Sequence, residues 1–175
     1  VVETEGTVRM SAAMAGVQLI STGSELNAGS VLSTGSNGRV VLSRGEQAIV
    51  VGPNSRMSLP AAQEKGETKI LQTLGTLMFK VDKRKEKHFS VETPVIAAVV
   101  KGTTFTVTAG FDSHSVHVAE GAVEVSSANG AAMQMVTAGQ TVFVSKQNPA
   151  VIQNRPPAKL TIEEARNESA KREYS

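Results

Sequence analysis

The chain has 175 residues and a formal net charge of +2, and it contains no cysteine, which excludes thiol catalysis and thiolate metal ligands. This length is enough for one domain with its own hydrophobic core and a small appendage. The low net charge argues against nucleic acid as a partner, and no apolar run is long enough for a helix that spans a membrane.

Residues 1–146 consist of valine- and threonine-rich segments that alternate with glycine-containing turns, a pattern typical of short β-strands. A loose repeat, in which a glycine is followed by alternating apolar residues, begins at Gly6, Gly75, Gly102, Gly121 and Gly139. Such a repeat fits the coils of a short β-solenoid-like roll, which we favour, and also the hairpins of a sandwich. We therefore predict an all-β domain over residues 1–146.

The strongest local charge lies in residues 80–88, which hold five Lys or Arg and two acidic residues. A mixed charge run of this kind is typical of a solvated connector between two strands. The alternative is a docking site for an acidic partner. The residues that would make this contact are Lys83, Arg84, Lys85 and Lys87.

The stretch from Thr93 to Val107 is the most informative part of the chain. Its six apolar residues from Val95 to Val100 predict a strand that is covered on both faces. After Lys101-Gly102-Thr103, the alternation from Thr104 to Val107 predicts a strand with one buried face. Similar patterns place the following residues in the core: Phe79, Phe89, Phe105, Val107, Val118, Val123 and Val144.

Most of the motif residues have a structural explanation. Gly102 and Gly121 are expected in turns that require a positive φ. Thr93-Pro94 is expected to be extended, because the residue before a proline avoids the helical region. Lys101 is expected to pair with a carboxylate, such as that of Glu120, rather than to contact a ligand.

The order of these motifs along residues 5–145 resembles that of FecR domains, the extracytoplasmic β domains of bacterial signalling and envelope proteins. The residues that carry the resemblance are Gly6 and Val8, Leu26 to Arg39, Pro53-Asn54-Ser55, Leu74-Gly75, Phe89 to Pro94, Lys101-Gly102-Thr103 with Phe105, Glu120-Gly121 and Ala138-Gly139-Gln140. Lysine at position 101 stands where the family motif has arginine, and it lacks the bidentate guanidinium. The resemblance implies a periplasmic or extracellular domain that acts through protein–protein contacts in signalling or scaffolding. It also implies that a signal peptide preceded Val1 and has been removed.

Candidate catalytic chemistry is sparse, since the chain has only three His and two Asp residues. Asp112 and His114 are close in sequence, but they would need a third ligand to hold a metal ion. We interpret residues 110–114 as a polar hairpin tip instead. No catalytic residue, cofactor site or metal site is assigned, and we do not expect an enzyme.

Residues 147–175 form a second region, in which three prolines predict an extended arm and Thr161 to Glu164 form a capping box. The helix predicted from this box runs to Glu173 and has too few apolar residues to be stable alone. We therefore expect Leu160 and Ile162 to contact a partner protein or a second copy of the chain.

Two functions are consistent with the sequence. The first is a non-enzymatic FecR-like module that binds a protein partner. The second is a structural protein that self-assembles into oligomers or filaments through its strand edges and the C-terminal arm. The edges expected for such a contact are the strands at 102–108 and 139–144, which contain no charged residue.

Overall fold

The computed structural model describes residues 3–12, 16–24, 29–60, 67–83, 88–127, 130, 132–148 and 151–155. All regular structure in these residues is β, in sixteen strands. The prediction of an all-β body is therefore confirmed. The helix expected between Thr161 and Glu173 lies outside the described residues.

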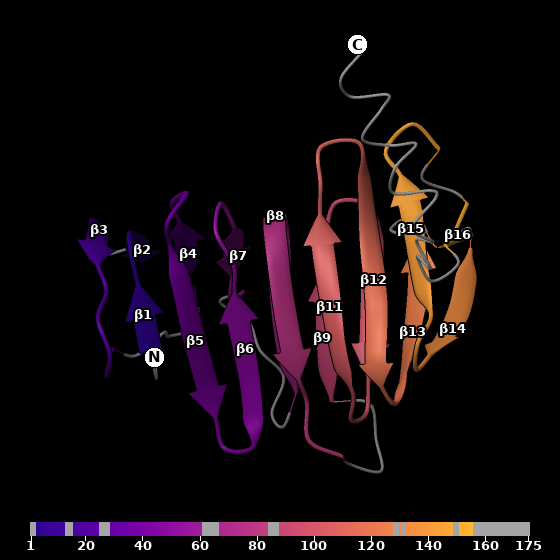
Figure 1. Ribbon diagram of the computed structural model, residues 1–175, viewed down its shortest axis with the longest axis horizontal. Helices are drawn as coiled ribbons and strands as arrows, with labels where there is room; N and C mark the ends of the chain where they lie inside the picture. Colours follow the sequence, from indigo (N-terminus) through magenta and orange to yellow (C-terminus); the bar gives the residue numbers. More distant parts are fainter. Residues whose placement is uncertain are drawn as a thin grey trace, which may run out of the picture.

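The strands lie in two facing layers that share one long strand, β8 (Thr68–Lys80), as Figure 1 shows. The front layer contains, in spatial order, β1 (Glu3–Glu5), β5 (Arg39–Arg44), β6 (Gln47–Val51), β8, β11 (Thr104–Ala109), β12 (Ser113–Glu120), β15 (Thr141–Ser145) and β16 (Gln153–Arg155). The rear layer contains β3 (Gly16–Leu19), β2 (Val8–Ala12), β4 (Val31–Thr34), β7 (Arg56–Ser58), β8, β9 (Phe89–Glu92), β10 (Ile96–Val100), β13 (Ala122–Ser127) and β14 (Met133–Thr137). Neighbouring strands are antiparallel except for β8 and β9, which run parallel.

Strand β8 passes from one layer to the other near its middle. Its first half pairs with β7 and β9 in the rear layer, and its second half pairs with β6 and β11 in the front layer. The crossing is at Gly75, which has a φ of 92° and packs so closely on Ser55 that an added Cβ would collide with it. Glycine is required there both for its backbone conformation and for its lack of a side chain.

After β8 the chain forms hairpins that alternate between the layers. The hairpins β9–β10 and β13–β14 belong to the rear layer, and β11–β12 and β15–β16 belong to the front layer. Each hairpin pairs with the next one in its own layer, through β10–β13 and β12–β15. The described strands therefore belong to one continuous sheet, which curls into two facing layers joined through β8.

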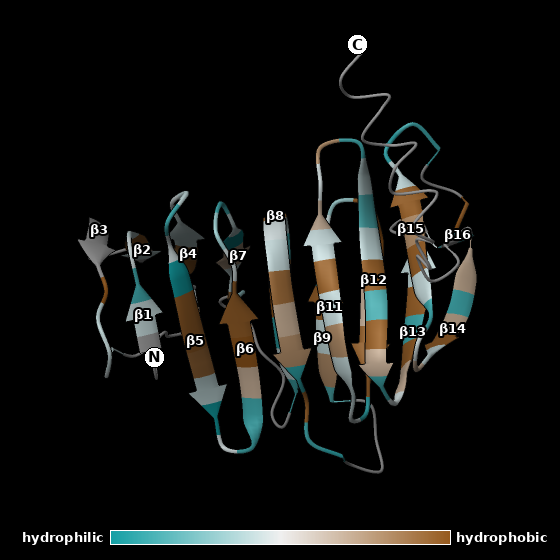
Figure 2. Cartoon of the chain, viewed as in Figure 1, coloured by the Kyte–Doolittle hydropathy of each residue, from teal (hydrophilic) through white to brown (hydrophobic). Residues whose placement is uncertain are grey.

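The hydrophobic core lies between the two layers. The ring of Phe105 stacks on that of Phe79 at 5.0 Å between centroids, and Phe89 meets Phe79 edge-on at 5.7 Å. All seven residues predicted for the core are buried, which confirms those predictions. Figure 2 shows the origin of this core, because apolar and polar residues alternate along strands such as β11 and β12.

Strand β10 differs from the prediction. Val95 to Val100 was expected to be covered on both faces, but only one face of the strand is fully buried. Ala97 and Val99 lie on the outer face of the rear layer, where neighbouring side chains cover them only partly. The prediction that β10 is buried on both faces was therefore wrong, because no further layer of the described residues packs on its outer face.

The sheet edges also differ from the prediction. The strands expected as edges, β11 and β15, each have a neighbour on both sides. The described edges are β1 and β16 in the front layer and β3 and β14 in the rear layer. Strand β16 comes from the region expected to be an extended arm outside the body, and residues 153–155 instead extend the front layer of the body.

Candidate interaction surfaces

The Lys101-Gly102-Thr103 motif joins three connections at one end of the molecule. The backbones of Thr103 and Val81 exchange two hydrogen bonds, with N–O distances of 2.9 and 3.1 Å. The buried hydroxyl of Thr103 also donates to the carbonyl oxygen of Ala122 at 2.9 Å. The motif therefore holds together the end of β8, the β10–β11 connection and the start of β13.

Gly102 is needed in this joint for a different reason from the one predicted. Its φ is not positive, but an added Cβ would collide with the main chain of Lys83. Gly121 does have the expected positive φ, at 87°, and an added Cβ there would lie 2.8 Å from the carbonyl oxygen of Gly102. Close backbone packing, which the sequence pattern does not report, therefore accounts for Gly102.

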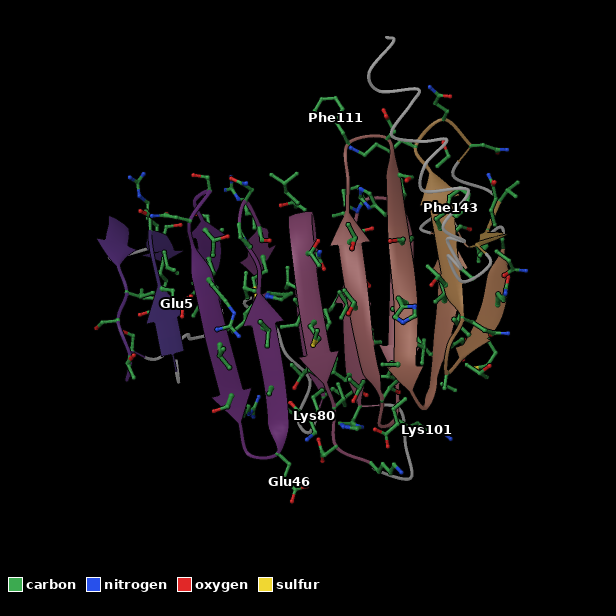
Figure 3. The ribbon with its side chains drawn as sticks, in the orientation of Figure 1. Glu5, Glu46, Lys80, Lys101, Phe111 and Phe143 are labelled. Carbon is green, nitrogen blue, oxygen red and sulfur yellow. The ribbon has the colours of Figure 1, made fainter. Side chains whose placement is uncertain are left out.

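This joint places three lysines, Lys80, Lys83 and Lys101, at the same end of the molecule, which we call the basic end. All three side chains are exposed, and Figure 3 shows Lys80 and Lys101 near each other at the lower end. The expected ion pair between Lys101 and Glu120 is not formed, and Glu120 is exposed. The Lys101 ammonium group is thus available to a partner.

The charged segment of residues 80–88 leaves the body and returns to it at neighbouring points. Asp82 Oδ1 lies 3.4 Å from Nε2 of His88, so the two ends of the segment between them are held together. Lys83 is the described residue of the predicted docking set. Arg84, Lys85 and Lys87 lie outside the described residues, as do Leu160 and Ile162 of the tail, and their partner-binding roles stay predictions.

Thr93 connects the two layers through its hydroxyl group. Thr93 Oγ1 accepts hydrogen bonds from the backbone N–H groups of Val95 and Ile96, at 3.2 and 3.0 Å. It also lies 2.7 Å from Nδ1 of His114, on β12 in the front layer. The hydroxyl of Thr93 and the imidazole of His114 thus share a hydrogen bond that joins the two layers. Pro94, beside it, is exposed.

His114 does not lie in the polar hairpin tip that the sequence predicted. The tip is formed by residues 110–112, and Asp112 is exposed there, whereas His114 is fully buried within β12. The two side chains therefore do not form a metal site. More generally, no cluster of three or more potential ligands for a metal ion exists within the described ranges.

The pKa of His114 is lowered, first by burial and then by the positive charge of Lys146, while the backbone carbonyl of Gly110 opposes this shift. In the unfolded chain this histidine titrates near 6.5. Below that pH the unfolded chain binds the proton more readily than the folded protein does. The contribution of His114 to stability is therefore complete above about pH 6.5 and decreases as the pH falls below it.

We predict that this loss can be measured by urea unfolding of the protein at pH 7.5, 6.5 and 5.5. The free energy of unfolding of the wild type should fall across this series more steeply than that of His114→Gln, which cannot take up the proton. His117→Gln is the matched control, because His117 is exposed on the same strand. Equal slopes for the wild type and His114→Gln would contradict the prediction.

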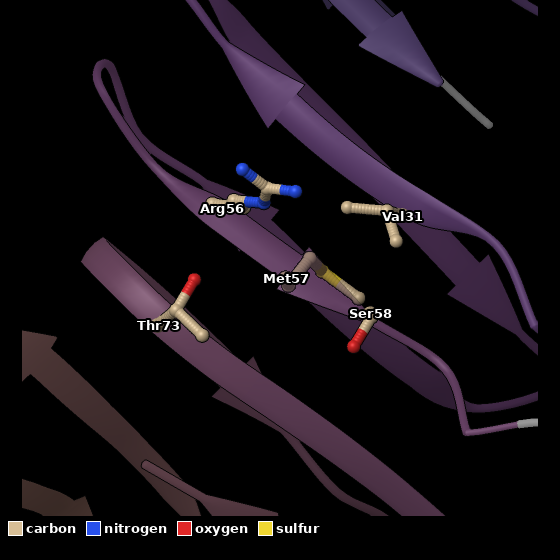
Figure 4. Close-up of a pocket in the computed structure, with 5 residues that line it drawn as sticks. All are labelled: Val31, Arg56, Met57, Ser58 and Thr73. Atoms are coloured by element: carbon tan, nitrogen blue, oxygen red, sulfur yellow. The ribbon is translucent and has the colours of Figure 1, made fainter. Parts of the chain in front are cut away.

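Two hollows lie on the outer face of the rear layer, and no sequence motif predicted either of them. The first, of about 360 Å³, is lined by Val31, Arg56, Met57, Ser58 and Thr73, as Figure 4 shows. The second, of about 320 Å³, is lined by residues that include Thr7, Arg9, Ser33 and residues 35–37. The first hollow coincides with a register shift between β7 and β8. An irregularity of this type bends the strand and increases its local twist.

The described part of the chain offers no helix of the length and hydropathy needed to cross a membrane. No curated protein matches the chain. Two crystal structures, at resolutions of 1.65 and 2.50 Å, of a candidate anti-sigma factor from Parabacteroides distasonis have a similar fold, each with a TM-score of 0.62. The identity is 19%, and the match covers 74% of this chain and 61% of that protein. This likeness concerns the fold alone.

The FecR protein family matches residues 30–124, more than half of the chain. The matched segment runs from the start of β4 into β13. It includes the Lys101-Gly102-Thr103 joint and Glu120-Gly121, but it is narrower than the resemblance over residues 5–145 that the sequence motifs indicated. On this match, the chain belongs to the FecR protein family.

Proposed function

We propose that this chain is a non-enzymatic domain that works outside the cytoplasm, in the periplasm or the extracellular space, and binds a protein partner in envelope signalling. Family membership supports this proposal. So does the fold that the chain shares with a candidate anti-sigma factor, because anti-sigma factors act by binding proteins. Scaffolding in the envelope is a role of the same kind, and the partner rather than the fold would distinguish it from signalling.

The basic end is the observation that carries the proposal. The tight joint between Gly102 and Lys83 holds Lys83 and Lys101 on neighbouring connections, and Lys80 ends the strand that leads into them. The family motif thus positions charges as well as turns. An acidic surface of a partner protein would meet several lysines at once, which favours fast and salt-sensitive association.

In-cell photo-crosslinking in the native host tests this function. A photoreactive amino acid in place of Lys101 should give a discrete adduct with one envelope protein. The control position is Phe111, which is 91% exposed and lies at the opposite end in Figure 3. A cytoplasmic adduct would contradict the proposed location. The absence of any specific adduct from Lys101, or the same adduct from both positions, would contradict docking at the basic end.

We expect the combined replacement of Lys83, Arg84, Lys85 and Lys87 by serine to abolish the Lys101 adduct with little effect on thermal stability. The reason is electrostatic, since exposed charges attract a partner but contribute little to folding. Binding by the wild type should also weaken steeply with added salt, because charges are screened beyond about 8 Å at physiological ionic strength. If the Lys101 adduct still forms after all four residues are replaced, the segment is a solvated connector and does not bind the partner.

Self-assembly is the second candidate, and the edge strand β14 favours it. No described strand pairs with its outer side, and its side chains Met133 and Met135 are 69% and 53% exposed. The backbone N–H of Ser127 donates to the carbonyl oxygen of Ala132 at the start of this hairpin, so alternation turns the backbone groups of Met133 and Met135 toward the open side. Two copies could pair there in antiparallel fashion around a twofold axis.

Light scattering after size exclusion tests this candidate. Met135→Lys should convert a dimer to a monomer, because a charge on an edge strand opposes pairing, whereas Phe111→Lys should change nothing. Truncation after Arg155 retains β16, so a change in the oligomeric state of this variant would show that residues 156–175 contribute to assembly. A wild-type monomer at all concentrations, or a dimer that survives Met135→Lys, would exclude assembly through β14.

A further inference from the structure

The outer face of the rear layer carries a row of positive charge that its own strands do not neutralise. Register places Arg9 of β2 opposite Ser33 of β4, and Ser33 opposite Arg56 of β7. The strands β3, β2, β4 and β7 contain these two arginines and no Asp or Glu. In the strand order of the rear layer, the next acidic residue after β7 is Glu92 on β9, and it is paired with Lys69 at 3.1 Å.

The three side chains of this row share one face of the sheet. Directly opposed residues in antiparallel strands point the same way. In β4, Leu32 and Thr34 are buried, so Ser33 faces outward, and Arg9 and Arg56 are both exposed. Two strand spacings separate the arginines by about 9–10 Å. Both guanidinium groups can therefore reach an anion held above the Ser33 hydroxyl, and neither is engaged in an ion pair with a described residue.

The two hollows lie on opposite sides of this row along β4. One is next to Val31 and Ser58 and has Met57 in its wall, so its lining is partly apolar. The other is next to Ser33 and residues 35–37, and most of the residues that line it have polar side chains. In an extended peptide, side chains on one face recur every second residue, about 6.8 Å apart. Val31 and Ser33 have the same spacing on β4, so such a peptide matches the surface in period.

We propose that the row Arg9–Ser33–Arg56 with its two flanking hollows binds an extended acidic segment of a partner protein. The central Asp or Glu carboxylate lies between the two guanidinium groups. An apolar side chain two residues away enters the Val31–Met57 hollow, and a small polar side chain on the other side enters the hollow at residues 35–37. A peptide fits better than a small anion, because the row is open and supplies no buried donor that would hold an isolated ion. This inference rests on the proposed function, since it describes a protein partner, but it uses a surface separate from the basic end.

The test is an NMR titration of the full-length, isotope-labelled chain with three probes. The first is a capped pentapeptide with Leu, Glu and Ser at positions one, three and five and alanine between them. The second has Gln in place of Glu, and the third is inorganic phosphate. The glutamate peptide should shift amide signals of residues 31–34 and 56–58 and bind about tenfold more tightly than the glutamine peptide, since the charge-assisted hydrogen bonds depend on the carboxylate.

Variants assign the effect to the row. R9Q and R56Q should each weaken binding of the glutamate peptide about tenfold. R44Q removes the same charge from an exposed position of β5 in the front layer and should leave binding unchanged. All these residues are exposed, so an unchanged signal dispersion will show that the variants fold.

Three results would overturn the proposal: equal affinity for the glutamate and glutamine peptides, shifts confined to other residues, or phosphate binding as tight as that of the glutamate peptide. The last result would identify a site for small anions instead. These outcomes are independent of the Lys101 crosslink. If the titration fails and the Lys101 crosslink forms, peptide binding at this row is excluded and the proposed function is retained. If the crosslink is absent and the titration succeeds, docking at the basic end is excluded and peptide binding at this row is retained.

Discussion

Replacing Phe105 with alanine lowers the free energy of unfolding by about 3–5 kcal/mol, the loss typical of truncating a fully buried phenylalanine. Phe105 is 0% exposed, and its ring stacks on Phe79 at 5.0 Å between centroids. Phe79 in turn contacts Phe89 from the rear layer. The cavity would therefore open where the two layers meet and could not be filled by solvent.

Urea unfolding at neutral pH measures this loss, provided that the slope with denaturant stays the same. Phe111→Ala is the matched control, because Phe111 is exposed, with the Lys146 ammonium group 5.9 Å from the centre of its ring. That variant should lose less than about 1 kcal/mol. A loss below 1 kcal/mol for Phe105→Ala would contradict the packing of the layers described above.

Replacing Gly75 with alanine should lower the free energy of unfolding by about 2–5 kcal/mol. Of this, about 1–2 kcal/mol comes from the strain of a left-handed backbone with a side chain. A further 1–3 kcal/mol or so comes from crowding, because the new Cβ collides with Ser55 and must displace β7 or β8. Since β8 belongs to both layers, the displacement affects the whole body.

Gly45→Ala separates these two effects. Gly45 also has a positive φ, at 59°, but an added Cβ there would have no atom within 4 Å. This variant should therefore show only the conformational strain of about 1–2 kcal/mol. If both variants lost the same amount in urea unfolding, Gly75 would be required for its backbone conformation alone, and close packing at the layer crossing would play no part.

The all-β class and the core were predictable because they depend on local alternation. Residues such as Phe105 and Val107 lie two positions apart in a strand, so their side chains point to the same face and their spacing predicts that both are buried. The family was likewise predictable from ordered motifs such as Lys101-Gly102-Thr103. The burial of His114 was not predictable in this way. A polar residue near a turn is usually exposed, and His114 is buried because a residue distant in sequence, Thr93, forms a hydrogen bond with its ring.

By itself, then, the sequence determined that this protein is built from β-strands, which apolar side chains of its alternating strands face the interior and to which family it belongs, since these features follow from period-two patterning and short motifs. Only the tertiary structure decided which residues from distant parts of the chain are neighbours. The packing of Gly102 on Lys83 and the row Arg9–Ser33–Arg56 join residues that are 19 to 47 positions apart in the chain. Strand register sets such neighbours, and register depends on the packing of the whole sheet rather than on any local segment.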